Sequence, residues 1–92
     1  MKKYITKKEI AAAEKIIGRL GVGMEIKLES LAACTVKAEN DRAESYYRGA
    51  IWGTLDTLER VGQLNVTEMF LLDRYYTDKI WDLQAKAKAG VA

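Results

Sequence analysis

Hydrophobic residues near the start of the chain recur every three or four positions, which is the spacing of one face of an α-helix. They are Ile10, Ala13, Ile17 and Leu20. Thr6 and Glu9 have the spacing of a capping box, in which each side chain accepts a hydrogen bond from the other residue's backbone N–H group, and Ile5 with Ile10 has that of a hydrophobic staple. Glycine commonly follows the last helical residue. The sequence therefore predicts a helix that begins at Lys7 and ends by Gly21.

The next stretch, from Val22 to Ser30, fits two patterns. Hydrophobic and charged residues alternate over positions 24–29, as in a half-buried strand. However, Met24, Leu28 and Leu31 also form a helical face, and no second segment of the chain shows a convincing period of two with which a strand could pair. We therefore favour a helix here, with a strand over residues 24–29 left open.

A third hydrophobic stripe lies between Glu44 and Val61 and has helical spacing. Its positions are Tyr47, Ile51, Thr54, Leu58 and Val61. Asn40 and Asp41 are of the residue types that begin helices, and Glu44 has the reciprocal capping position. Residues 30–61 therefore form either one bent helix or two helices that separate at Asn40.

The last helix is predicted from the signals at its start. Gly62 is placed to end the preceding helix, and Asn65 with Glu68 repeats the capping box. A long apolar face follows between Val66 and about Lys88: Met69, Leu72, Tyr76, Ile80, Leu83 and Ala87. The sequence thus predicts one all-α domain over residues 1–92, a bundle of three to four helices that ends in a helical hairpin with its turn near residues 62–65.

Composition narrows the possible functions. The 92 residues are 49% hydrophobic and 30% charged, which is typical of a folded domain, and they include one cysteine and no histidine. Without histidine the chain lacks the commonest general base and metal ligand. Cys34 is interpreted as an inert helix residue. No apolar run reaches the roughly 20 residues of a membrane span, and the start of the chain does not resemble a secretory signal. We expect a cytoplasmic protein that is not an enzyme, with no catalytic residue, metal, cofactor or membrane partner.

The most informative side chain is Trp52, which lies well away from the hydrophobic face of its helix and among charged residues. Gly49 and Gly53 leave bare backbone beside it. On the last helix Phe70, Thr77 and Trp81 form a second apolar stripe, which either two neighbouring helices or another chain would cover. We predict an interaction surface for a protein partner or a homo-oligomer, with these residues: Trp52, Tyr46, Gly49, Gly53, Phe70 and Trp81.

A second hypothesis concerns the basic end of the chain, which could bind a small ligand or the phosphates of a nucleic acid. Its candidate residues are Lys2, Lys3, Lys7, Lys8 and Arg19. The segment Ile16-Ile17-Gly18-Arg19-Leu20-Gly21 resembles the Ile-Gly-x-x-Gly loop of KH domains, which implies nucleic-acid contacts by Gly18, Arg19 and Gly21. The resemblance covers six residues, and the three-stranded sheet of that family is not predicted. A helix that ends in glycines explains the same residues, and we prefer it.

In length and texture the chain resembles the short helical accessory proteins of bacteriophages and other mobile elements, several of which inhibit host defence enzymes by binding them. The resemblance implies a possible setting and assigns no residue a role. The function predicted from the sequence is a small protein-interaction module, self-associating or binding and inhibiting a larger protein.

Overall fold

The structure, a computed structural model, describes residues 4–90, which form an all-α bundle of four helices. The helices are α1 (Lys7–Leu20), α2 (Val22–Lys37), α3 (Asp41–Arg60) and α4 (Val66–Lys88), and residues 4–90 contain no strand. The helix favoured for residues 24–29 is therefore confirmed. Residues 30–61 divide at Asn40, so of the two alternatives two helices are present.

Local signals set these boundaries. The Thr6 hydroxyl accepts from the Glu9 amide at 3.1 Å and the Glu9 carboxylate accepts from the Thr6 amide at 3.0 Å, so the predicted capping box is confirmed. The equivalent pair of bonds joins Asn65 and Glu68. The Asn40 side chain caps α3 by accepting from the Ala43 amide at 2.8 Å. Gly21, with φ of 101°, separates α1 from α2 in a conformation that glycine adopts at little cost.

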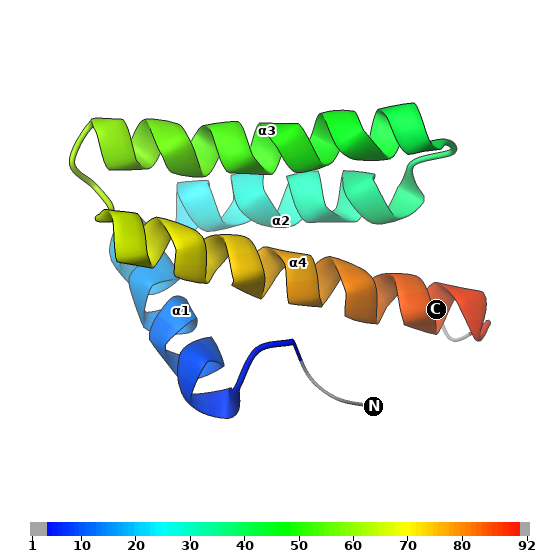
Figure 1. Ribbon diagram of the computed structural model, residues 1–92, viewed down its shortest axis with the longest axis horizontal. Helices are drawn as coiled ribbons and strands as arrows, with labels where there is room; N and C mark the ends of the chain where they lie inside the picture. Colours follow the sequence, from blue (N-terminus) through cyan, green and yellow to red (C-terminus); the bar gives the residue numbers. More distant parts are fainter. Residues whose placement is uncertain (1–3, 91–92) are drawn as a thin grey trace.

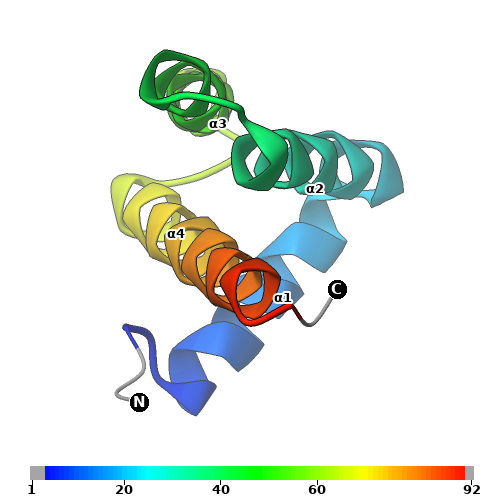
Figure 2. The ribbon, with the colours of Figure 1, turned by 90° about the vertical axis from the view of Figure 1, so that its right-hand side faces the viewer.

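The helices are arranged around α4. Figure 1 shows α2 and α3 as an antiparallel hairpin, with α4 running along it and α1 crossing on the opposite side of α4. Figure 2, seen along the helices, shows that α4 lies between α1 and the α2–α3 pair. Within residues 4–90, α1 contacts α2 and α4 but not α3. α3 and the beginning of α1 therefore lie on either side of α4.

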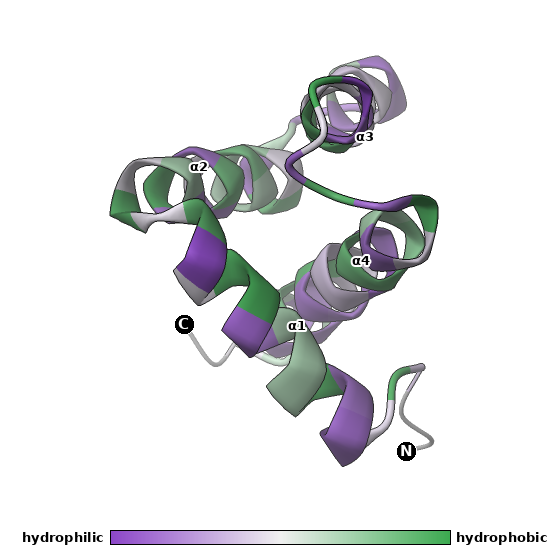
Figure 3. Ribbon diagram, turned by 90° about the vertical axis from the view of Figure 1, so that its left-hand side faces the viewer, coloured by the Kyte–Doolittle hydropathy of each residue, from purple (hydrophilic) through white to green (hydrophobic). Residues whose placement is uncertain are grey.

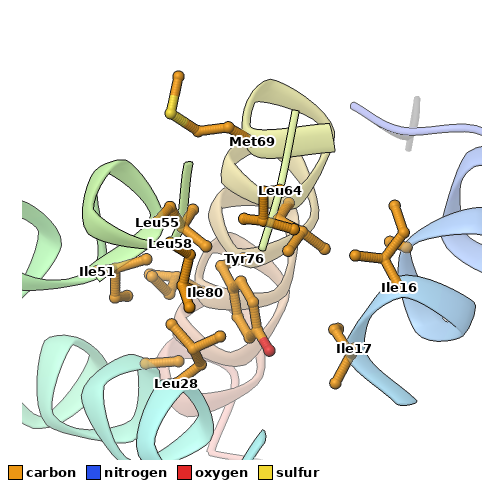
Figure 4. Packing of buried hydrophobic residues seen from close by; sticks show 13 residues of the cluster. Ile16, Ile17, Leu28, Ile51, Leu55, Leu58, Leu64, Met69, Tyr76 and Ile80 are labelled. Atoms are coloured by element: carbon orange, nitrogen blue, oxygen red, sulfur yellow. The ribbon is translucent and has the colours of Figure 1, made fainter. Parts of the chain in front are cut away.

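Hydrophobic and hydrophilic residues are mixed along every helix (Figure 3). The buried residues of α2, α3 and α4 surround Tyr76, and those of α1 close the cluster from the opposite side (Figure 4). The largest side chains with almost no exposed surface are Tyr76, Ile5, Leu28, Leu55, Leu72 and Ile80. None of α1–α4 is both long and apolar enough to cross a membrane.

Three residues expected on the core faces are exposed: Val61, Leu83 and Ala87. Val61 is 65% exposed because α3 ends at Arg60, and Leu64 folds back into the core instead. Leu83, which is 37% exposed, and Ala87 follow Ile80, the last buried residue of α4. Conversely, Ile16 and Leu55 are buried although the predicted stripes omitted them. These errors arise because periodicity gives the direction of a helical face, whereas neighbouring helices determine how wide the buried face is and where it ends.

Candidate interaction surface

Three aromatic residues that the sequence placed outside the core, Trp52, Phe70 and Trp81, take part in two ring pairs. Trp52 on α3 contacts Phe70 on α4, with ring centroids 5.6 Å apart and planes inclined by 43°. Trp52 remains 37% exposed and Phe70 52% exposed, so the pair covers the seam between the two helices and is itself open to solvent. The structure therefore brings these two predicted surface residues together.

Beside this pair the seam between α3 and α4 is polar and closed. Arg48 donates to the Thr77 hydroxyl at 3.2 Å, and Gln84 donates to the Glu44 carboxylate at 3.4 Å. Burial raises the pKa of the Asp73 carboxyl group, while the positive charge of Arg48 opposes that shift. Thr77 is buried by these contacts, so it belongs to the helix–helix seam and not to the exposed surface.

The second ring pair joins Trp81 to Tyr4, a residue that precedes α1. Their centroids are 5.0 Å apart with planes at 60°, and both rings stay about half exposed. Trp81 follows Phe70 by eleven positions, which is close to three helical turns and about 16 Å along α4. Both therefore lie on the same side of α4. We call Trp52, Phe70, Trp81 and Tyr4 the aromatic ridge.

A groove lies between α1 and α4 on the other side of Phe70 from Trp52. It has a volume of about 480 Å³ and is lined by Lys8, Glu9, Ala12, Thr67, Phe70, Leu71 and Arg74. The Arg74 guanidinium forms an ion pair with Glu9 and so links α4 to the first turn of α1. Phe70 forms part of the wall of this groove, which places the groove directly beside the ridge.

The other three predicted surface residues are apart from the ridge. Tyr46 is 72% exposed and packs edge-on against Tyr47 near the turn between α2 and α3. Gly53 lines a shallow hollow of about 290 Å³ between α2 and α3. A Cβ atom added to Gly49 or Gly53 would meet no atom within 4 Å, so packing within residues 4–90 does not require either glycine. Their part in binding stays a prediction.

The basic residues proposed for phosphate binding are also dispersed. Lys2 and Lys3 lie outside the described residues, while Lys7 and Lys8 are exposed in the first turn of α1. Arg19 lies at the other end of that helix, where it donates to both carboxylate oxygens of Glu68 at 2.9 and 3.1 Å and to the Gln63 carbonyl at 3.0 Å. The Glu68 carboxylate raises the pKa of Arg19, and Arg19 lowers the pKa of Glu68. A phosphate would have to compete with Glu68, and the phosphate site stays a prediction.

The segment that resembles a KH loop has an ordinary helical role. Gly18 lies within α1, and Gly21 forms the junction between α1 and α2. Because no strand occurs in residues 4–90, the sheet that accompanies such a loop in KH domains is missing from this part of the chain. The helix that ends in glycine, which we preferred, is confirmed.

Reactive groups are sparse around the ridge. Within residues 4–90, no group of three or more His, Cys, Asp or Glu residues is placed to hold a metal ion. Cys34 is half-buried on α2 and is not among the residues of the ridge or its groove. The ridge therefore consists of exposed aromatic rings, with the charged side chains of Lys8, Glu9 and Arg74 in the adjoining groove.

Comparisons with protein-family models, with curated proteins and with solved structures found no match to this chain. Sequence reasoning placed Trp52, Phe70 and Trp81 outside the core from their positions on helices, and all three are exposed. It missed Tyr4 as a neighbour of Trp81, and it missed the groove beside Phe70, because both depend on how the segment before α1 and α1 itself pack on α4. No periodic signal in the sequence encodes those contacts.

Proposed function

We propose that this protein is a small, non-catalytic module that binds another polypeptide through the aromatic ridge. The observation that carries the proposal is the alignment of Phe70 and Trp81 on one side of α4, each with a second aromatic ring against it and each about half exposed. Clustered exposed aromatic side chains are typical of interaction sites, because they bury large areas at little conformational cost.

The energetic argument is that the core is complete without these rings. Tyr76, Leu72 and Leu55 are almost fully buried in the main cluster, whereas Trp52 and Phe70 lie outside it. A partner that covered the exposed parts of the ridge would gain buried apolar area without rearranging the bundle. Truncating a tryptophan anchor of this kind typically costs about 2 to 4 kcal/mol of binding free energy.

The test compares two alanine variants of aromatic residues on the same helix. Trp52→Ala removes the ridge residue, and Tyr46→Ala removes an exposed ring that lies off the ridge. Binding is measured by light scattering for self-association and by affinity selection from a displayed library of amphipathic helical peptides. We expect Trp52→Ala to weaken binding at least about 30-fold, which corresponds to about 2 kcal/mol, with a nearly unchanged melting temperature. A surface confined to the ridge predicts that Tyr46→Ala binds like the parent protein, whereas the surface predicted from the sequence, which includes Tyr46, predicts weaker binding.

The opposite pattern contradicts the proposal. If Trp52→Ala lowers the melting temperature strongly and leaves binding intact, the indole is a structural residue of the α3–α4 seam. If both variants bind as tightly as the parent protein, the ridge is not the binding surface.

The chain resembles, in its length and general character, short helical accessory proteins of bacteriophages and other mobile elements, and this resemblance makes the proposed function more specific. In a bacteriophage or other mobile element, such a module would act by binding a larger host protein and inhibiting it. The ridge supports this inhibitory role only by providing a surface for a protein partner.

A further inference from the structure

The junction between α1 and α2 is a single residue, Gly21. Its backbone has φ of 101° and ψ of 161°, a combination that is essentially restricted to glycine. α1, α3 and α4 each begin beside a capping side chain, whereas Gly21 has no side chain with which to cap α2. The backbone amides of residues 22–24 therefore begin α2 without an intrahelical acceptor. A continuous helix would give them the carbonyl groups of residues 18–20.

The apolar positions of α1 continue in phase into α2, as they would in one unbroken helix. They recur every seven residues on both sides of Gly21: Ile10, Ile17, Met24 and Leu31. A spacing of seven residues is close to two helical turns, so in a continuous helix these side chains would lie along one side. Two separate helices do not need this agreement, because each can turn its own face toward the core. The sequence therefore suits a single long helix over residues 7–37.

The rest of the bundle does not depend on α1 for its own contacts. Within residues 4–90, α2, α3 and α4 all contact one another, whereas α1 contacts α2 and α4 but not α3. Figure 1 shows α1 turning away from α2 at their junction. The buried residues of α1 are Ala13, Ile16 and Ile17. If α1 straightened into line with α2, these side chains and the face of α4 that they cover would both need a new partner.

We propose that α1 exchanges between two copies of this chain. In the exchanged dimer residues 7–37 form one continuous helix, and α1 of each copy packs on α2 and α4 of the other copy. The surfaces are complementary from the start, because the contacts of α1, apart from those at the hinge itself, re-form with an identical chain. This inference goes beyond the proposed function and does not rest on the aromatic ridge.

Exchange also changes how the groove beside Phe70 is built. Lys8, Glu9 and Ala12 line this groove from α1, and residues of α4 form its other wall. In the exchanged dimer one wall comes from each copy. Each of the two grooves then has the same lining residues as before, but neither is complete without the second chain.

Gly21 sets the balance between the closed monomer and the exchanged dimer. Glycine adopts the bend at little cost and is a poor helix former, so the parent chain favours the closed form. Gly21→Ala opposes the bend and favours the continuous helix, because a residue with a side chain is strained at this φ. Two hinges straighten in each dimer. An effect of about tenfold at each hinge therefore multiplies to about 100-fold in the dissociation constant.

The first experiment compares Gly21→Ala with Gly18→Ala. Gly18 lies inside α1 with open space where a Cβ atom would be, and it is helical in both forms, so it is the matched control. Association is measured by sedimentation equilibrium, with circular dichroism to verify the fold. We expect the parent protein to dimerise at the highest concentrations, Gly21→Ala to dimerise at least about 100-fold more tightly, and Gly18→Ala to behave like the parent. A folded Gly21→Ala monomer at all concentrations would overturn the proposal.

The second experiment keeps Gly21 and shows directly whether α1 crosses to another chain. Glu9→Arg and Arg74→Glu each replace the ion pair between α1 and α4 with two like charges, both in the closed form and in a dimer of one variant. In a mixed exchanged dimer, the arginine introduced at position 9 of one chain meets the glutamate introduced at position 74 of the other. The unchanged Glu9 and Arg74 also meet, so both contacts become attractive.

We expect the mixed dimer to have a dissociation constant about tenfold lower than that of either variant alone. The capping bond that Glu9→Arg removes is absent from the monomer and the dimer alike, so its loss cancels. If the mixture associates no more tightly than the separate variants, α1 stays on its own chain and the proposal is wrong.

Trp52→Ala separates this inference from the proposed function. The exchanged dimer does not use the ridge, so this substitution should leave its dissociation constant unchanged. A dimer that Trp52→Ala weakens and that mixing the charge variants does not favour associates through the ridge. That result would support the proposed function and overturn the exchange of α1.

Discussion

The hydroxyl group of Tyr76 allows a sharp test of the packing described above. Tyr76 is 1% exposed at the centre of the core, and its hydroxyl oxygen is buried without a hydrogen-bond partner. An unpaired buried polar group costs about 1 to 3 kcal/mol relative to the hydrated group. Tyr76→Phe removes that cost and keeps the ring, so we expect the free energy of unfolding to increase by about 1 kcal/mol. For 92 residues this corresponds to a rise in melting temperature of about 5 °C.

The same substitution changes the response to alkaline pH. Burial, with a smaller contribution from the negative charge of Glu29, raises the pKa of Tyr76 above its ordinary value of 10.0. The unfolded chain therefore loses this proton at a lower pH than the folded protein does. The stabilising contribution is complete below pH about 10 and is lost as the pH rises toward the folded pKa, with a slope of up to about 1.4 kcal/mol per pH unit. Tyr76→Phe should lose stability less steeply than the parent protein above pH about 10.

Urea unfolding followed by circular dichroism, at neutral pH and at several alkaline values, measures both effects. The matched control is Tyr75→Phe, because Tyr75 is adjacent but only half-buried and its hydroxyl is not a buried, unpaired group. At neutral pH this control should change stability by no more than about 0.5 kcal/mol. If Tyr76→Phe instead destabilises the protein by about 1 kcal/mol, the hydroxyl has a hydrogen-bond partner in solution and the reasoning is refuted.

Three further predictions address other parts of the bundle. Gly49→Ala and Gly53→Ala should each raise the free energy of unfolding by about 0.5 to 1 kcal/mol in urea titrations, because both glycines lie inside α3 with open space where a Cβ atom would be; a loss of stability would contradict this. Leu72→Ala should lower it by about 2 to 5 kcal/mol in the same titrations, since Leu72 is fully buried, and a loss below about 1 kcal/mol would contradict the packing. Arg19→Gln should raise the pKa of Glu68 in an NMR titration, since the Arg19 hydrogen bond is the main cause of the lowered pKa. The stabilisation linked to Glu68 is present above the ordinary pKa of the carboxyl group and is lost as the pH falls through its folded-state pKa, and the substitution should reduce it. An unchanged Glu68 pKa would refute the pairing.

The helix boundaries were largely predictable because local chemistry sets them. Thr6 with Glu9, and Asn65 with Glu68, predicted the first residues of α1 and α4 from side-chain spacing alone. The break at Asn40 was not predictable, since the same residues can lie within a bent helix, and only the packing of α2 against α3 distinguishes the two. Burial at the helix ends was likewise set by neighbours, which is why Val61 was wrongly placed in the core.

The candidate surface was predictable to a smaller extent. Position on a helix wheel identified Trp52 and Phe70 as residues outside their core faces, but it could not show that their rings touch. That contact depends on the register of α3 against α4, which the turn at Gly62 and the buried Leu64 determine. Tyr46, like Trp52, is an aromatic residue of α3 outside the predicted core face, yet it lies toward the α2–α3 turn. Residues with similar sequence patterns therefore lie in different parts of the structure.

The candidate surface depends on α1 as much as on the aromatic residues. One wall of the groove beside Phe70 belongs to α1, which does not contact α3 within residues 4–90. The ion pairs of Glu9 with Arg74 and of Arg19 with Glu68 hold α1 on α4 at two points, and the buried side chain of Ile5 anchors the segment before it. A change that loosened α1 would leave the contact between Trp52 and Phe70 in place while removing the groove on the other side of Phe70. The exposed rings alone therefore do not make the whole candidate surface; the packing of α1 on α4 completes it.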